Sequence, residues 1–316
     1  MKKILVVAPQ YVGDSILVIP FLRNLRKAYP NDVIDVVTKN AGKLVLSVCP
    51  YINKVYEEES LYLEERLKPD FYDKAYVLKR SLSAALLVKK LKIKNTIGFG
   101  GQFREFILKK TVKYKRGEKH ELEHFLDVLK AENLDTNDKT LEYWTKEEDV
   151  NTVKKYFTEN KKKALIVTSS STYVKNWTKS GFCDVINFLK DNNYECFIVG
   201  TEKEKEFNNQ FSDAKNLCGE LTFNQISALI SQMDLVFGID SGFCHMACAF
   251  NKKTVALFGS TSLTQWELRG ENSHTLSLNL KCSPCKKAKN CKKDFKCMKD
   301  FSSQFVIEYL KNKDIV

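Results

Sequence analysis

The segment VFGIDSGFCHMACAF, residues 236–250, sets polar residues between two apolar runs. The polar or backbone-permissive residues are Asp240, Ser241, Gly242 and His245. The runs on either side are typical of a buried strand followed by a buried helix. Amides in the first turn of a helix point toward an anion, and a serine there adds a donor. The segment therefore predicts an anion-binding turn.

The same residues also suggest a hydrolase triad, because they include a serine, an acid and a histidine. The nucleophile elbow G-x-S-x-G would require glycines at 239 and 243, where the chain has Ile239 and Phe243. A hydrolase is therefore disfavoured. His245 remains open between a ligand contact and a structural residue that locks the turn.

A second polar segment, SSSTYVKNW at 169–177, follows an apolar run. The hydroxyls of Ser169 and Ser170 and the ammonium of Lys175 are suitable ligands for a phosphate. No G-x-x-x-x-G-K-[ST] sequence occurs in the chain, so this is not a P-loop. The alternative is a polar loop with a solvated lysine.

The third candidate is YVGDSI at residues 11–16, where a first strand passes into a helix. Gly13 permits a tight turn there, and Asp14 lies at the expected helix N-terminus. An aspartate in that place is commonly an N-cap. It can also act as a general base, because its second oxygen stays available.

Charge and cysteines mark a fourth segment. The net charge is +12, which favours anionic partners such as nucleotides, nucleic acid or a phosphate-bearing membrane surface. Residues 281–300 hold eight lysines and two aspartates. They also hold four cysteines, which could bind a structural zinc ion or simply stay reduced. The four are Cys282, Cys285, Cys291 and Cys297.

Along the whole chain, short apolar segments alternate with helical patterns, which predicts parallel β-sheets built from βαβ units. The alternation occurs twice, giving an N-terminal domain at 1–143 and a C-terminal domain at 144–316. The latter carries the Cys/Lys-rich segment 281–300 and a final helix that could pack back on the first domain. Ligands of such sheets bind at the carboxyl ends of strands, so we expect the site in a cleft between two facing domains.

Some classes are excluded by what the sequence lacks. The first apolar run is too short for a signal peptide, and no segment is long enough to span a bilayer. A cytoplasmic protein is expected. No G-x-G-x-x-G follows the first strand, which argues against NAD. No Asp-x-Asp occurs, so a common metal-bridging motif of sugar-nucleotide enzymes is missing.

Together these segments resemble the bacterial family 9 glycosyltransferases, which include the ADP-heptose:lipopolysaccharide heptosyltransferases. The resemblance rests on ILVVAPQYVGDSILVIPFLRNLRKAYP, YDKAYVLKRSLSAALLVKKLKIKNTIGF, KNW, IDSGFCHMACAFNKKTVALFGSTS and CSPC, and covers nearly the whole chain. It implies an α/β GT-B fold of two Rossmann-like domains. It also implies an inverting reaction that needs no metal or other cofactor.

The resemblance implies roles for individual residues. Asp14 matches the general base. Lys175, Ser169 and Ser170 match contacts to the donor diphosphate, and the turn at Asp240 matches the donor-binding block. Glu204, or else Glu202, matches the acid that binds the nucleoside ribose. We place Gly13, Arg104 and Lys113 on the acceptor side, the last two in the basic, aromatic stretch 99–116.

The expected activity is transfer of a heptose or related sugar from a nucleotide-sugar, suspected to be ADP-heptose. The implied acceptor is a lipopolysaccharide core or another anionic lipid-linked saccharide, reached at the cytoplasmic face of the inner membrane through peripheral contact. Nucleic acid is not an expected partner. One alternative is a GT-B enzyme with another donor, such as a UDP-sugar. A more distant one is a non-enzymatic basic adaptor with a four-cysteine zinc knob.

Overall fold

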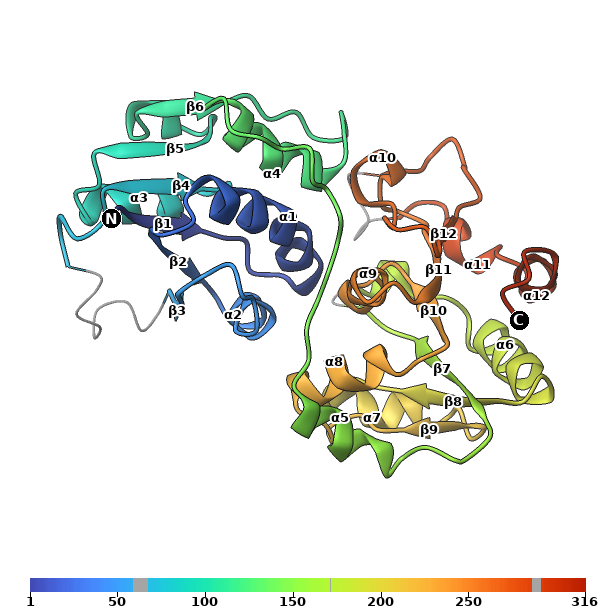
Figure 1. The fold of residues 1–316 in the computed structure, drawn as a ribbon. Helices are drawn as coiled ribbons and strands as arrows, with labels where there is room; N and C mark the ends of the chain where they lie inside the picture. Colours follow the sequence, from blue (N-terminus) through green and yellow to red (C-terminus); the bar gives the residue numbers. More distant parts are fainter. Residues whose placement is uncertain (59–67, 171, 286–290) are drawn as a thin grey trace. The chain divides into compact units, whose positions relative to one another are not determined.

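The computed structural model describes the whole chain apart from residues 59–67, 171 and 286–290 (Figure 1). It divides into two compact units, Met1–Leu141 and Glu142–Val316. Each unit is built around its own parallel six-stranded sheet. Within the described residues, no helix combines the length and apolar composition that a bilayer span requires.

The first unit has strand order β3-β2-β1-β4-β5-β6. Its strands are β1 (Lys3–Val7), β2 (Val33–Thr38), β3 (Lys54–Glu57), β4 (Lys74–Val77), β5 (Asn95–Phe99) and β6 (Lys110–Val112). Its helices are α1 (Val12–Ala28), α2 (Ala41–Leu46), α3 (Leu82–Lys90) and α4 (Glu121–Lys130), with a short 3₁₀ helix, η2 (Arg104–Phe106). The central strand β1, KILVV, is apolar after its first residue because helices cover both faces of such a sheet.

The second unit has strand order β12-β11-β10-β7-β8-β9. Its strands are β7 (Lys162–Val167), β8 (Tyr194–Ile198), β9 (Ala214–Asn216), β10 (Leu235–Ile239), β11 (Lys253–Leu257) and β12 (Ser273–Leu276). Its helices are α5 (Glu147–Lys154), α6 (Lys179–Asp191), α7 (Glu202–Asn208), α8 (Phe223–Ser231), α9 (Gly242–Ala249), α10 (Leu263–Trp266), α11 (Lys296–Lys299) and α12 (Ser303–Asn312), with the 3₁₀ helix η3 (Tyr173–Lys175). Numbered within its own unit, this is the same order as in the first unit, 3-2-1-4-5-6, the Rossmann arrangement.

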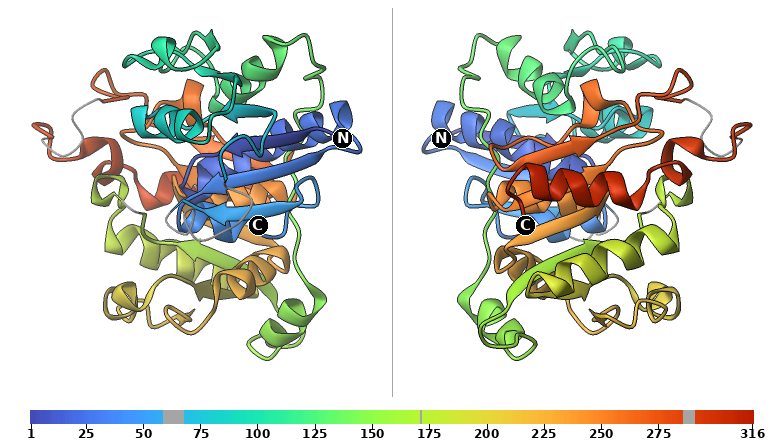
Figure 2. Two further views of the ribbon diagram at one scale, coloured as in Figure 1. Left: turned by 90° about the vertical axis from the view of Figure 1, so that its left-hand side faces the viewer. Right: turned by 90° about the vertical axis from the view of Figure 1, so that its right-hand side faces the viewer.

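The predicted fold of two Rossmann-like parallel-sheet domains is thus confirmed at the level of each unit. The sequence missed the short edge strands β6, β9 and β12, which carry too few apolar residues to give a strand pattern. The final helix α12 packs beside α6 (Figure 2), and its Val306 and Leu310 belong to the core of the second unit. Its described packing is therefore on its own unit.

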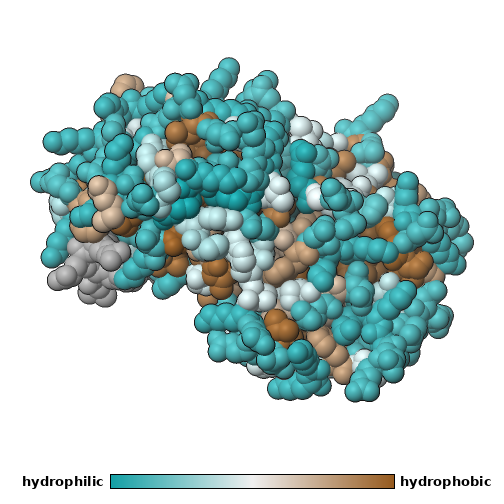
Figure 3. All heavy atoms as spheres, in the orientation of Figure 1, coloured by the Kyte–Doolittle hydropathy of each residue, from teal (hydrophilic) through white to brown (hydrophobic). Residues whose placement is uncertain are grey.

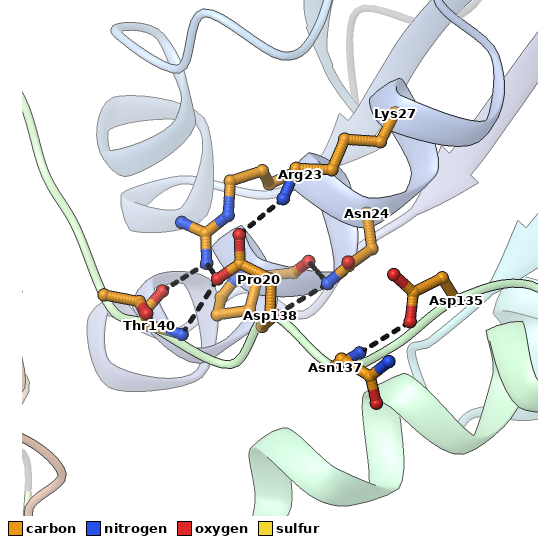
Figure 4. Close-up of polar contacts among 8 residues, drawn as sticks. All are labelled: Pro20, Arg23, Asn24, Lys27, Asp135, Asn137, Asp138 and Thr140. Atoms are coloured by element: carbon orange, nitrogen blue, oxygen red, sulfur yellow. Dashed lines mark hydrogen bonds and ion pairs between the residues drawn. The ribbon is translucent and has the colours of Figure 1, made fainter.

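The segment that leaves the first unit is fixed to α1 by a polar cluster (Figure 4). Arg23 donates to the Asp138 carboxylate and to the Thr140 carbonyl, and Lys27 donates to the same carboxylate at 2.6 Å. Asn24 donates to the Asp138 carbonyl at 2.7 Å. Partial burial raises the pKa of Asp138, but the hydrogen bonds from Lys27 and Arg23 outweigh it and lower the pKa to about 2. The chain is therefore anchored directly before it enters the second unit.

Candidate functional site in the second unit

Two of the predicted segments follow neighbouring strands of the second sheet. Strand β7 leads into residues 168–177, and β10 leads into the turn before α9. The strands pair side by side up to Val167 and Gly238. An added Cβ at Gly238 would lie 2.3 Å from the Val167 carbonyl oxygen, so no side chain fits between the strand ends. This is the topological switch point of the sheet, where ligands of open α/β sheets bind.

The two segments meet in an ion pair. The Lys175 ammonium lies 2.7 Å from Oδ2 of Asp240, and the side chains are 26% and 6% exposed. The backbone amide of Asp240 donates to the Leu257 carbonyl at 3.1 Å, which fixes the carboxylate beside β11. Asp240 therefore holds the ammonium at the strand ends, and the partly exposed lysine is positioned to reach an anion.

Helix α9 begins beside this pair. Ser241 is its N-cap, with the side-chain oxygen accepting from the Phe243 amide at 3.4 Å, and Gly242 is its first residue. The first-turn amides of Phe243 and Cys244 bond only to Ser241, at 3.4 Å and 3.2 Å, and an anion at this positive end of the helix would compete for them. The helix thus supplies backbone donors next to the ammonium of Lys175.

His245 lies one turn into α9 and is buried. Burial lowers its pKa, while the charge of Asp240 raises it and that of Lys175 lowers it further. The net direction is downward, so the ring is neutral at pH 7. Its Nδ1 is buried and has no hydrogen-bond partner within the residues described. The ring is thus both close to the pair and incompletely satisfied.

The two predicted phosphate-binding serines already have partners within the protein. The Ser169 hydroxyl donates to the Glu204 carboxylate. The Ser170 hydroxyl bonds to the backbone of Thr172 through both its carbonyl, at 3.1 Å, and its amide, at 3.3 Å. Any phosphate contact by these hydroxyls would compete with these bonds.

Glu204 itself closes a capping box at the start of α7. Its Oε2 accepts from the amide of Thr201 at 2.8 Å and from the hydroxyl of Thr201 at 2.9 Å. Glu202, the other candidate for the ribose, is exposed and lies against Gly219. The two acids therefore differ in that the carboxylate of Glu204 is committed to the start of its own helix, whereas that of Glu202 belongs to an exposed residue and lies against Gly219.

Candidate residues in the first unit and the cysteine segment

Asp14 lies in the first turn of α1, and the helix N-cap is Tyr11. The interpretation of Asp14 as the N-cap is therefore wrong, because the N-cap lies three residues earlier, at Tyr11. Gly13 is the second helical residue. The loop before the helix is fixed, since Thr38 donates to the Pro9 carbonyl at 2.6 Å and the Gly42 amide donates to the Gln10 carbonyl at 3.0 Å.

Arg104 is buried rather than presented to a ligand. Its Nε donates to the Phe99 carbonyl at 2.8 Å, and its Nη2 donates to the Gly100 carbonyl at 2.5 Å. Its Nη1 donates to Oε1 of Gln102 at 3.0 Å. Burial lowers its pKa. Its geometry is that of a residue that holds a loop, whereas Lys113 is exposed.

Sequence reasoning missed a second cation–carboxylate pair. Arg80, three residues after β4, contacts the carboxylate of Glu121, and the side chains are 29% and 0% exposed. Its guanidinium also lies over the Tyr114 ring, 4.0 Å from the centroid, and the Tyr114 hydroxyl donates to Glu121 at 3.2 Å. The signal was the dipeptide Lys79–Arg80 directly after an apolar strand of the first sheet, at its own switch point.

The four cysteines of segment 281–300 are all free thiols. Burial raises the pKa of Cys297, and the charges of Cys285, Cys282 and Cys291 raise it further, so each of these three thiols lies within electrostatic reach of Cys297. Within the described ranges, however, no three His, Cys, Asp or Glu side chains are placed to hold a metal ion. The residues as placed do not form a zinc site. Structural zinc stays a prediction without support from this geometry.

The profile of glycosyltransferase family 9 (heptosyltransferase) matches residues 61–296, which include both switch-point segments of the second unit. The chain belongs to this family. The lipopolysaccharide heptosyltransferase 2 of Escherichia coli is 26% identical over 290 residues, covering 82% of this chain and 83% of that protein. The predicted glycosyltransferase activity is thereby confirmed.

Solved structures agree on the fold. The E. coli ADP-heptose LPS heptosyltransferase II superposes with a TM-score of 0.83 at 23% identity, covering 98% of each chain. The E. coli heptosyltransferase WaaC, solved with ADP-2-deoxy-2-fluoro heptose, gives a TM-score of 0.74 at 14% identity, covering 98% of this chain and 99% of that one. The GT-B class expected for this family 9 chain is confirmed.

Proposed function

We propose that this family 9 glycosyltransferase transfers a heptose from ADP-heptose to a lipopolysaccharide core acceptor, with inversion at the anomeric carbon. The observation that carries the donor site is the ion pair of Lys175 with Asp240 at the switch point of the second sheet. The related E. coli enzymes are named heptosyltransferases, and one was solved with an ADP-heptose analogue, which supports the donor class.

In this proposal the second unit binds the donor. The diphosphate lies against the first turn of α9, whose amides and Ser241 donate to it. The ammonium of Lys175 stabilises the charge that develops on the leaving ADP, since preorganised donors are worth most where charge grows. His245, buried and neutral, offers one hydrogen bond to a phosphate or to the sugar.

The first unit binds the acceptor and supplies the base. The acceptor hydroxyl attacks the anomeric carbon from the face opposite the ADP, and the new C–O bond forms as the bond to the diphosphate oxygen breaks. Asp14 takes the hydroxyl proton, a contribution of roughly 10²- to 10⁴-fold. ADP leaves with the electron pair, and its charge rests on Lys175 and the α9 amides. No step in this scheme requires a metal ion.

The ribose contact is proposed for Glu204, with Glu202 as the alternative. Glu204 already accepts from Ser169 and Thr201, so its ribose contact would exchange one of these bonds, whereas the exposed Glu202 could form a new one. Calorimetric titration of ADP into Glu202→Gln and Glu204→Gln separates them. Loss of affinity in Glu204→Gln alone supports the assignment, and loss in Glu202→Gln alone overturns it.

The experiment that tests the proposed function is a transfer assay read by mass spectrometry. We expect transfer from ADP-heptose to a lipopolysaccharide core acceptor, unchanged by EDTA, and little transfer from UDP- or GDP-sugars. Transfer from a UDP-sugar alone would establish the alternative GT-B donor. Loss of activity in EDTA, restored by a divalent cation, would contradict the metal-independent scheme.

The acceptor is proposed to be anionic and lipid-linked, and the protein to work at the cytoplasmic face of the inner membrane. The +12 net charge supports this, because a basic protein is drawn to an anionic membrane surface. Figure 3 shows that the visible face is mostly hydrophilic, with few hydrophobic side chains scattered over it. The proposed contact with a bilayer is peripheral.

A further inference from the structure

One loop of the first unit exposes two phenylalanines. Phe103 and Phe106 are 73% and 84% exposed, the highest values among the exposed large hydrophobic side chains after Met1. Their rings stack on each other, with centroids 6.5 Å apart and planes 28° apart. Single exposed apolar side chains are common on protein surfaces, whereas adjacent ones are typical of interaction surfaces. The stacked pair therefore indicates an interaction surface.

The loop is built to hold these rings outward. The buried Arg104 lies between them in sequence and donates to the Phe99 carbonyl, the Gly100 carbonyl and Gln102. The Glu105 carboxylate accepts from the Gly101 amide. Directly after the loop, Leu108 is buried in a core cluster and Ile107 packs on it. The rings therefore extend from a fixed base.

The backbone of the loop adopts a conformation that side chains rarely take. Gln102 has φ 55° and Phe103 has φ 66°, in the left-handed region. For a bulky residue such as phenylalanine this conformation is an outlier that costs of order 1 kcal/mol or more. The chain thus adopts a backbone conformation that costs stability at the residue that presents an exposed ring.

Basic side chains follow the aromatic pair. Lys109, Lys110, Lys113, Lys115 and Arg116 are all exposed. Among the residues that the structure describes, only Lys115 of these five has a carboxylate partner, Glu118, at 3.9 Å. Exposed aromatic rings beside uncompensated basic charge match a bilayer that carries anionic headgroups, since rings enter the interface while lysines meet phosphates.

We propose that residues 99–116 form a membrane-contact surface, in which Phe103 and Phe106 enter the interface of an anionic phospholipid bilayer. This inference rests on the proposed function, because a lipid-linked acceptor gives the enzyme a reason to bind a membrane. Arg104 is then a positioning residue, since it holds the loop that carries the two rings. The basic residues add an electrostatic attraction that salt weakens.

Vesicle binding of the full-length protein tests the proposal. Co-sedimentation is measured with phosphatidylcholine vesicles, with and without phosphatidylglycerol, over a range of NaCl concentrations. We expect binding to the anionic vesicles that falls as salt rises, and a loss of about tenfold or more in the double variant Phe103→Ser/Phe106→Ser. The matched control is Phe305→Ser on α12, which removes an exposed phenyl ring of the second unit and should bind like the wild type.

A second readout shows whether the rings enter the bilayer. The fluorescence of Phe106→Trp should be quenched by brominated phosphatidylcholine in anionic vesicles, and that of Phe305→Trp should not. Double-variant binding equal to wild type, or wild-type binding equal on neutral and anionic vesicles, would overturn the proposal. The proposal would also be overturned if the wild type is a dimer, the double variant is a monomer and vesicle binding is unchanged. The two rings would then form a contact between subunits.

Transfer to a deacylated, water-soluble core saccharide keeps the two proposals apart. The double variant should transfer to this acceptor at the wild-type rate, because neither ring is assigned to the donor site or to the base. If no nucleotide-sugar supports transfer by the wild type, the proposed function fails while the vesicle result still stands. If transfer proceeds and the vesicle result fails, only the membrane surface is lost.

Discussion

The two units share one strand order, and both carry a cation–carboxylate pair at the carboxyl end of the sheet, yet the pairs differ in construction. Lys175 and Asp240 come from the two loops that flank the switch point, after β7 and β10. Arg80 follows β4, but its partner Glu121 lies on α4, is fully buried and accepts a hydrogen bond from the Tyr114 hydroxyl. The first pair lies at the proposed donor site, and the second ties a loop to a helix.

This difference shows that sheet topology places charges without deciding their roles. A carboxylate that sits on the strand-end loop can orient a cation toward a ligand. A carboxylate that is fully buried on a helix mainly requires the cation to neutralise it, because an unpaired buried charge is expensive. The following experiments separate the two roles, beginning with the residue whose loss should cost most.

Asp14→Asn should give the largest effect, a fall in kcat of roughly 10²- to 10⁴-fold, if the first unit supplies the base. The donor's Kd, measured by calorimetry, should stay unchanged because donor binding is proposed for the second unit. Asn keeps the size of the side chain, so folding should be preserved. Full transfer activity in this variant would leave Asp14 as a residue of the first helical turn only.

Lys175→Ala should raise the Kd for ADP by about 10- to 100-fold, the value expected for loss of a charge-assisted hydrogen bond. Calorimetry measures this directly. Lys179→Ala, at the exposed first position of α6, removes a nearby lysine as a control. Unchanged ADP affinity in Lys175→Ala would show that the Lys175–Asp240 pair is not part of the donor site.

Arg80→Ala should act on stability, because it leaves Glu121 buried and without its cation. We expect the first unit to lose about 1–3 kcal/mol, measured by urea unfolding, with the Kd for ADP unchanged. Arg116→Ala, an exposed arginine of the same unit, should lose much less. A loss of acceptor affinity without loss of stability would contradict the contrast between the two pairs.

Asp138→Asn should give the smallest effect, about 1 kcal/mol in the unfolding of the first unit at pH 7, because the carboxylate is partly exposed. The folded pKa of Asp138 is about 2, below its unfolded value of about 3.9. The stabilisation is therefore present above pH 4 and is lost as the pH falls through 2. Urea unfolding at pH 7 and at pH 3 should show the difference between wild type and variant shrinking in acid; a constant difference would refute the ion-pair anchor.

The sequence alone determined the strands that are buried on both faces. Short continuous apolar runs such as KILVV and LVFGI are typical of the inner strands of a parallel sheet. It also identified the polar segments after β1, β7 and β10, since parallel topology places them at one edge of each sheet. The sequence did not predict the short edge strands β6, β9 and β12. Each of them forms by hydrogen bonding to a neighbouring strand, and its own residues give no strand pattern.

Only the tertiary structure decided which polar residues meet. Lys175 and Asp240 are 65 positions apart in the chain, and Ser169 and Glu204 are 35 apart. Arginine is usually found at the protein surface, but Arg104 is buried. Three acceptors of its own loop satisfy its guanidinium. Local periodicity reports which face of an element is apolar, whereas the partner of a charge depends on contacts that form only when distant segments fold together.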